Sequence, residues 1–357
     1  MKRFHIGLRR LCSVLLGMVF FVSGCLKLID PVGAGLVMEE YFKFLHLSFL
    51  NPAAEALGVA MALLEALTGA MLVAGTFRKL AALLASCMTA FFTLLTLMLV
   101  IFNPSMDCGC FGEAIHLSHW QTFIKNLILC ALAATAFLPV RDYGKASGVG
   151  KHVAFWLTAA ALCAFTIISL THLPVRDFTE MTPGTELDAD VPLLTVSDAD
   201  MNYDDDFFAD KKLVAASVYR PDRLSGAQWE AILDRLEAAR REGLECALLT
   251  ASTPEDLQAI LGAAEGLEPV SAMELFNLAY YADYRKLLTL NRSNGGLVYI
   301  ADAQVIRKWH ARHLPDDDAF VAIYDYEPME VLMDMASSGK YSFQIGITAA
   351  LALLILL

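Results

Sequence analysis

Residues 80–112 read LAALLASCMTAFFTLLTLMLVIFNPSMDCGCFG, and this stretch joins a long apolar run to two closely spaced cysteines. Its first part, 80–102, has no charged residue and is long enough to cross the hydrocarbon core of a bilayer. Its end holds Cys108 and Cys110, the only two cysteines of the chain that stand close in sequence, and another apolar run begins near Trp120. The cysteine pair is therefore expected in a short loop at a membrane surface.

A single residue, Gly109, separates the two cysteines, whereas two residues separate them in the usual redox arrangement. The smaller ring of a Cys108–Cys110 disulfide would be strained and easier to reduce, which suits thiol exchange. Two alternatives stay open: a static disulfide that locks the loop, or a zinc or copper site that adds His116 and His119. The spacing matches no common zinc finger and an oxidising compartment favours the disulfide, so no metal is assigned.

The 357-residue chain is 57% hydrophobic and divides into two parts of opposite charge. Residues 1–171 carry 12 Lys and Arg against 8 Asp and Glu, whereas residues 172–357 carry 15 against 31. Seven of the eight cysteines lie in the first part, so the chain is not a small scaffold stapled by disulfides. The acidic second part has no basic stripe, which argues against nucleic-acid binding. A membrane-embedded part and a soluble part are expected.

Six apolar segments have the composition of transmembrane helices, and at ~1.5 Å per residue they have about the required length. They are 11–29, 53–75, 80–102, 120–140, 153–170 and 342–357. The first follows four basic residues and could be mistaken for a signal peptide. No small-residue cleavage site precedes a polar mature start, and Lys27 interrupts the run late, so we expect a retained helix.

Basic residues gather at the N-terminus, at 78–79 and at 141–151. Short cytoplasmic loops are enriched in Lys and Arg, so these three segments are expected inside. Alternation then places the loop 30–52, the cysteine loop and the acidic stretch 172–340 on the opposite side. For a bacterial inner membrane that side is the oxidising periplasm.

Four charged residues lie in or near the predicted spans, namely Lys27, Glu55, Glu65 and Lys125. Glu65 is near the middle of its segment, where exposure of an acid to lipid costs at least ~2.5 kcal/mol. It is therefore expected to face the interior of the helix bundle and to pair with Lys27 or a polar neighbour. The other three lie nearer to helix ends, where a long side chain can extend to the membrane surface instead.

The residues after Thr171 have the pattern of a soluble α/β domain. The run 212–218 alternates like a strand, and Ser225 with Gln228 forms a capping box before an amphipathic helix that stops at Gly243. Further elements are expected as a strand at 244–249, a helix opening at 253–254, and a hairpin of 296–300 with 305–309.

Four segments of the first part resemble a known family: SGCLKLIDPVG at 23–33, EEYF at 39–42, DCGCFG at 107–112 and HWQTFIKN at 119–126. Together they are similar to the DoxX-like family of small four-helix membrane proteins, in the branch that includes the methylamine-utilisation protein MauE. The resemblance covers roughly residues 5–145. It implies a four-helix transmembrane domain and a setting in disulfide chemistry, quinone-linked oxidation or maturation of exported enzymes.

The second part resembles a thioredoxin-like domain of the kind fused to one group of DoxX-like proteins, because LVYIADAQVIRKWH at 297–310 looks like the closing hairpin. The segment 217–229, SVYRPDRLSGAQW, has no cysteine where an active thioredoxin carries its redox pair, and SNGG at 293–296 stands where a cis-proline is usual. Cys246 is expected to be a core residue. The expected domains are a DoxX-like four-helix bundle, a fifth transmembrane helix, a periplasmic thioredoxin-like domain and a C-terminal transmembrane helix, at 5–145, 153–171, 172–340 and 341–357.

These observations favour an integral membrane oxidoreductase in which Cys108 and Cys110 pass electrons between a periplasmic thiol client and a membrane quinone, or aid maturation of an exported enzyme. Cys25 and Cys130 are candidates for relaying electrons, although a lone membrane cysteine is usually a packing residue. Lys27 and Glu65 are candidates for the bundle interior. The expected partners are membrane lipid and the client. The alternative is a non-catalytic scaffold, in which the degenerate thioredoxin-like domain binds a client and the Cys108–Cys110 disulfide is structural.

The charge pattern predicts that both termini are cytoplasmic and that residues 172–340 lie outside the cytoplasm. A reporter that is active only in the periplasm is therefore expected to give full activity when fused after Leu290. Activity of a cytoplasm-specific reporter at the same position would reverse the orientation and remove the cysteine pair from the oxidising compartment.

Overall fold

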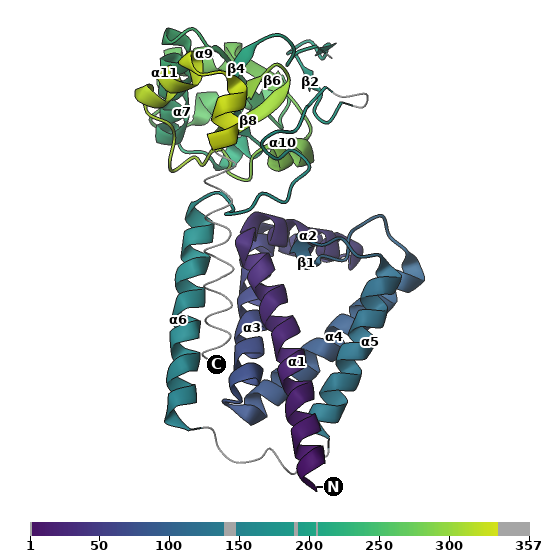
Figure 1. The fold of residues 1–357 in the computed structure, drawn as a ribbon. Coiled ribbons are helices and arrows are strands. Elements are labelled where there is room, and N and C mark those ends of the chain that lie inside the picture. Colours follow the sequence, from purple (N-terminus) through teal and green to yellow (C-terminus); the bar gives the residue numbers. More distant parts are fainter. Residues whose placement is uncertain (1, 139–147, 189–191, 205, 335–357) are drawn as a thin grey trace. The chain divides into compact units, whose positions relative to one another are not determined.

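The computed structural model describes residues 2–138, 148–188, 192–204 and 206–334, which are drawn in colour in Figure 1. The chain divides into two compact units, a helical one that ends near Leu170 and a second one that begins at Thr171. The predicted C-terminal span 342–357 and the basic residues at 141 and 145 lie outside the described residues. Each unit is described by itself.

Five helices of the described chain are long and apolar enough to cross a membrane. They are α1 (Lys2–Ile29), α3 (Ala54–Ala74), α4 (Arg78–Phe102), α5 (His119–Phe137) and α6 (Val149–Thr171). Each corresponds to a span predicted from the sequence, with ends that differ by a few residues at most except where α1 extends back to Lys2. The protein is therefore a multi-pass membrane protein whose outer helix surfaces contact lipid.

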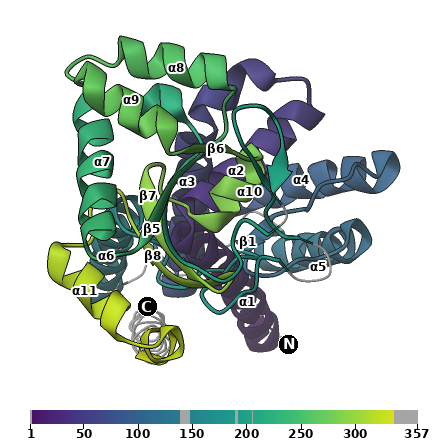
Figure 2. The same ribbon diagram turned by 90° about the horizontal axis from the view of Figure 1, so that it is seen from above.

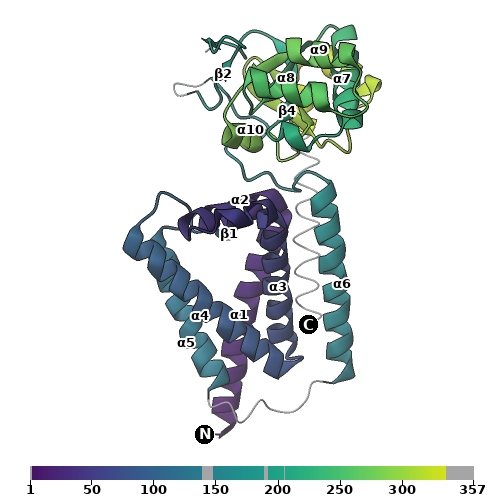
Figure 3. The same ribbon diagram turned by 180° about the vertical axis from the view of Figure 1, so that it is seen from behind.

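Helices α1 and α3 approach each other most closely, because small residues line their contact. A Cβ atom at Gly24 would lie 2.5 Å from the backbone nitrogen of Ala66, and one at Gly17 would lie 2.7 Å from the Cβ of Leu72. Close backbone approach of this kind drives helix association in lipid. Helices α4 and α5 pack on each other and spread away from α1 and α3 toward the end that carries α2 and β1 (Figures 1 and 3).

The segment 30–52, which we expected to be a loop, instead contains helix α2 (Pro31–Phe44) and the short 3-10 helix η1 (Ser48–Ala53). The sequence holds the start signal: Asp30 accepts a hydrogen bond of 2.9 Å from the backbone N–H of Gly33, and Pro31 occupies the first helical turn. Helix α2 is too short to span a bilayer and lies across the ends of α1 and α3 (Figure 1). It covers one end of the helical unit.

The second unit is built on a seven-stranded mixed sheet in the order β3-β2-β6-β5-β4-β7-β8. The strands are β2 (Val196–Ser197), β3 (Tyr203–Asp204), β4 (Lys212–Val218), β5 (Glu245–Thr250), β6 (Ala279–Tyr281), β7 (Gly296–Ala301) and β8 (Gln304–Trp309). Strands β4, β5 and β6 run parallel, and β7 and β8 add an antiparallel hairpin beside β4. The helices are η2 (Pro221–Arg223), α7 (Gly226–Arg241), α8 (Pro254–Ala263), α9 (Pro269–Asn277), α10 (Tyr284–Leu290) and α11 (Asp317–Asp325).

The two faces of this sheet are covered by different helices (Figure 2). Alternate residues of β4 point to opposite faces of the sheet. On one face, Val214 and Ala216 belong to the core that contains Trp229 of α7. On the other face, the hydroxyl of Ser217 donates to the carbonyl of Leu287 in α10. The predicted capping box of α7 is present, with the Ser225 N–H bonded to Gln228 Oε1 at 2.9 Å. The predicted strands and closing hairpin are confirmed with ends that differ by one residue.

Candidate functional site

The segment that joins α4 to α5 contains strand β1 (Cys110–Glu113). This segment packs against α1 and α2. Gly109 has φ +60°, a conformation that favours glycine, and a Cβ atom there would collide with the side chain of Val37 in α2. The single residue between the two cysteines is therefore fixed as glycine both by its backbone conformation and by the close contact with α2.

Two hydroxyl groups from different helices hold the cysteine backbone in place. Tyr41 of α2 donates a hydrogen bond of 2.8 Å to the carbonyl of Cys108, and Ser23 of α1 donates one of 2.6 Å to the carbonyl of Cys110. The Tyr41 hydroxyl also lies 3.7 Å from the Cys108 sulfur. Neither hydroxyl was singled out from the sequence, although both lie in segments that carry the family resemblance.

The two cysteines are free thiols whose sulfur atoms lie 3.2 Å apart. A disulfide has an S–S bond of about 2.05 Å, so a small side-chain movement closes the bond. Cys108 is buried, with 3% of its surface exposed, and Cys110 is partly buried. The structure thus brings together the pair that the sequence predicted as one unit.

The hydrogen bond between the thiols shifts their two pKa values in opposite directions. Donation from the Cys110 thiol lowers the pKa of Cys108 from 9.0 to about 6, against the opposing effect of burial, and Thr122 and Tyr41 add smaller contributions in the same direction. The pKa of Cys110 is raised well above 9.0 by the same hydrogen bond and by burial. Burial also raises the pKa of Tyr41, which therefore stays a neutral donor. At neutral pH the pair holds one reactive thiolate and one thiol.

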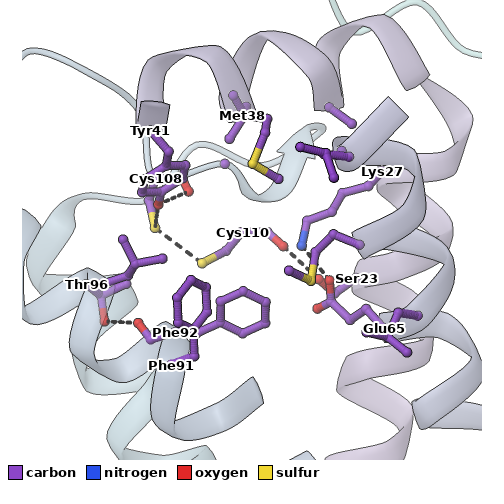
Figure 4. Close-up of a pocket in the computed structure, with 18 of the residues that line it drawn as sticks. Ser23, Lys27, Met38, Tyr41, Glu65, Phe91, Phe92, Thr96, Cys108 and Cys110 are labelled. Atoms are coloured by element: carbon purple, nitrogen blue, oxygen red, sulfur yellow. Dashed lines mark hydrogen bonds and ion pairs between the residues drawn. The ribbon is translucent and has the colours of Figure 1, made fainter. Parts of the chain in front are cut away.

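Both cysteines line an apolar cavity of about 540 Å³ between α1, α2, α3, α4 and α5. Figure 4 shows the two sulfurs on one wall of this cavity, facing the rings of Phe91 and Phe92 of α4. Polar groups are few, and the cavity has a volume typical of small-molecule sites, which are about 300–1,000 Å³. The arrangement joins a thiol pair to a space that accepts an apolar ligand.

The same cavity contains the ion pair of Lys27 and Glu65, whose Nζ and Oε2 atoms are 2.6 Å apart. The side chains are only 13% and 5% exposed, so the two charges neutralise each other inside the helical unit. The Lys27 ammonium also lies 5.7 Å from the centroid of the Phe92 ring. The pairing that was expected for Glu65 is present, and Lys27 does not extend to the membrane surface.

Of the other residues singled out from the sequence, only Lys125 lines this cavity. Cys25 packs against the core between the helices but does not line the cavity. Cys130 lines a second cavity of about 430 Å³ and has its sulfur 3.2 Å from Thr93 Oγ1. Lys125 lies on the cavity wall with its ammonium 4.8 Å from the centroid of the Phe111 ring, and Glu55 is exposed in the first turn of α3. The structure does not join Cys25 or Cys130 to the thiol pair.

The two histidines of the metal alternative bond to other groups. His116 Nδ1 lies 2.9 Å from Asp107 Oδ2, and His119 Nε2 lies 2.9 Å from the carbonyl of Met106. Within the described ranges, no cluster of three or more His, Cys, Asp or Glu side chains has the arrangement of a metal site.

The reactivity of Cys108 is expected to depend on pH through the hydrogen bond from its neighbour. Because the thiolate forms above the pKa, alkylation of Cys108 by iodoacetamide should rise through about pH 6 as the pH increases. Cys110→Ser keeps a hydroxyl donor and should retain a low inflection, whereas Cys110→Ala loses the donor and should shift the inflection upward. Mass spectrometry of the modified peptide measures both rates. An identical inflection in both variants would show that the hydrogen bond does not set this pKa.

The Lys27–Glu65 pair is expected to behave as one energetic unit. Glu65→Leu leaves a buried ammonium unpaired and should lower the free energy of unfolding by about 3–5 kcal/mol, with Glu65→Gln less costly because it keeps a hydrogen-bond acceptor. The double change Lys27→Leu with Glu65→Leu should recover most of this loss. Glu55→Leu, at an exposed acid of the same helix, is the control and should change little. Unfolding in detergent measures all four variants, and additive losses in the double variant would contradict the pairing.

Comparison with known proteins supports the membrane part of the resemblance. Residues 7–139 match the model of the family described as "Methylamine utilisation protein MauE". No curated protein and no solved structure matches the chain. The part of the chain that contains the thiol pair, its cavity and the Lys27–Glu65 ion pair is therefore similar to MauE.

Proposed function

We propose that the protein is a membrane thiol-disulfide oxidoreductase in which Cys108 and Cys110 carry electrons from an exported thiol client to a quinone of the membrane. The observation that carries the proposal is the position of two free thiols 3.2 Å apart on the wall of an apolar cavity inside a membrane-spanning unit. A pair that only locked a loop would not need a cavity for a ligand beside it.

The chemistry alternates between two half-reactions. A client thiolate attacks one sulfur of the Cys108–Cys110 disulfide and forms a mixed disulfide, and the second client thiolate then displaces the remaining protein sulfur. The client becomes a disulfide, and the protein pair takes two electrons and becomes two thiols. Cys108 is the better leaving group because its pKa is lower, so the client attacks Cys110. The quinone then accepts the two electrons and two protons, and the disulfide returns.

We infer the side of the membrane from the expected alternation of the helices. The cysteine loop follows α4, and the second unit follows α6, so two membrane crossings by α5 and α6 separate them. Both therefore belong on the same side. The basic residues at 78–79 begin α4 at its other end, which supports a bacterial inner-membrane location with the loop and the second unit in the periplasm.

The second unit is proposed to be a thioredoxin-like domain that binds a client without exchanging thiols. Its parallel strands with an antiparallel closing hairpin support this fold. After β4, where a redox pair would stand, the N–H and carbonyl of Arg220 bond to the side chain of Asn294 at 2.9 and 2.8 Å. The thiol of Cys246 donates to the carbonyl of Leu236 at 3.0 Å, and burial raises its pKa to about 11. Such a domain would bind the client. The name of the matched family suggests that this client is an enzyme of methylamine utilisation.

The alternative function is a scaffold in which the Cys108–Cys110 disulfide only stabilises the loop. The observation in its favour is that Gly109 packs tightly on α2 and that Cys108 is nearly inaccessible to solvent. In a scaffold the client binds to the second unit, and the helices serve as an anchor.

The two functions differ in the capture of a client. Cys108→Ser leaves Cys110, the sulfur that the client attacks, and should accumulate a mixed disulfide with an exported protein that is visible on a non-reducing gel. Single and double cysteine changes should abolish function equally, because a disulfide needs both sulfurs. Cys246→Ser is the control and should leave function intact. If neither single variant forms an adduct while both accumulate as unstable protein, the scaffold is correct and the oxidoreductase is not.

A further inference from the structure

We infer that the membrane quinone binds in the cavity beside the thiol pair. The quinone enters this cavity from the lipid between α3 and α4, and Lys27 binds an oxygen of the quinone. This inference rests on the proposed function, because it names the place where the quinone meets the reduced pair. It assigns a binding site and an entry path that the thiol chemistry alone does not require.

The rim of the cavity faces lipid. Leu57 and Leu64 of α3 and Phe91 of α4 line the cavity and yet are 41%, 38% and 49% exposed. Exposed apolar side chains on membrane-spanning helices contact the acyl chains of the lipid. Helices α3 and α4 are joined by a short turn at their other ends and spread apart toward the end that carries α2 (Figure 3). Exposed residues of both helices line the cavity, so we place its opening to the bilayer between them. A ligand dissolved in the membrane can enter there without crossing water.

The interior of the cavity suits a flat ring with a polar edge. Phe91 and Phe92 offer aromatic faces opposite the sulfurs, and the pair of Lys27 and Glu65 lies on the same cavity (Figure 4). An ammonium carries three donors, so Lys27 can bind Glu65 and a ligand oxygen at the same time. In a medium of low polarity, this charge stabilises the negative charge that develops on the oxygen of a quinone as it is reduced.

The electrons and atoms balance with one proton taken from water. The Cys110 thiol loses its S–H bond, and its sulfur forms one S–S bond with the Cys108 thiolate, which releases two electrons and one proton. The quinone takes the two electrons, this proton and the one from water, forms two O–H bonds and leaves as quinol. One quinone is consumed for each disulfide formed.

The test uses the full chain, purified, reduced and freed of reductant, with a decyl-substituted benzoquinone. Loss of the quinone's ultraviolet absorbance should accompany loss of two protein thiols per quinone. Ala60 lines the cavity and is exposed on α3, so Ala60→Trp should block the opening and slow this reaction by about tenfold or more, which equals about 1.4 kcal/mol. Ala131→Trp, at an exposed position of α5 that does not line the cavity, should keep the wild-type rate. Equal rates in both variants would overturn the inference.

A second variant tests Lys27 without leaving a buried charge unpaired. The double change Lys27→Leu with Glu65→Leu should raise the KM for the quinone and lower kcat, because the donor to the bound oxygen and the stabilisation of its developing charge are both lost. An unchanged KM would overturn the role of Lys27.

Decanol should not compete with the quinone, and inhibition by decanol as strong as that by a redox-inert ring analogue would show an acyl-chain site instead. If the wild type neither exchanges with a small soluble disulfide nor reduces the quinone, the proposed function fails; if it does both while Ala60→Trp and the double variant react like the wild type, this inference fails alone.

Discussion

The arrangement at the membrane surface depends on the hydrogen bonds that tie the cysteine backbone to two helices. A loop at the edge of the hydrocarbon region must find partners for its backbone groups within the protein, because lipid offers none. Ser23 of α1 and Tyr41 of α2 provide them for the carbonyls of Cys110 and Cys108. These two bonds hold the cysteine backbone where the two sulfurs lie 3.2 Å apart on the cavity wall. The hydrogen bond between the sulfurs, which lowers the pKa of Cys108, depends on this placement.

Burial of charge is the second constraint on the helical unit. Lys27 and Glu65 satisfy each other at 2.6 Å in surroundings where either alone is costly. Pairing keeps a cation next to an apolar cavity at a lower cost than an unpaired buried cation would carry. The thiol pair uses a related device, since the two sulfurs share one proton between them at neutral pH. Charge near the cavity is therefore present but compensated, which is what a site that moves electrons and protons in lipid requires.

The sequence predicts those features that rest on composition and local signals. Long apolar runs place the five described spanning helices, the depth of Glu65 predicts its pairing, and the capping residues Ser225 and Gln228 place α7. The helix α2 is missed because the apolar part of 31–44 is too short to span and is followed by charged residues, even though Asp30 and Pro31 hold its start signal. The cavity, and the roles of Tyr41 and Ser23, depend on how distant helices approach each other, which hydropathy and spacing do not encode. Similarity to MauE covers residues 7–139 and carries no geometry of the second unit.

The central claim is that the Cys108–Cys110 pair changes oxidation state as part of its work. The most direct measurement is the thiol state of the two cysteines in living cells, trapped by rapid acid quenching and alkylation, while the oxidation of the quinone pool is varied through respiration. The pair should become reduced when the pool is reduced and return to the disulfide when respiration resumes, and the Ala60→Trp variant should respond more slowly. A pair that stays fully disulfide-bonded under every condition would rule out electron transfer and assign the cysteines to structure alone.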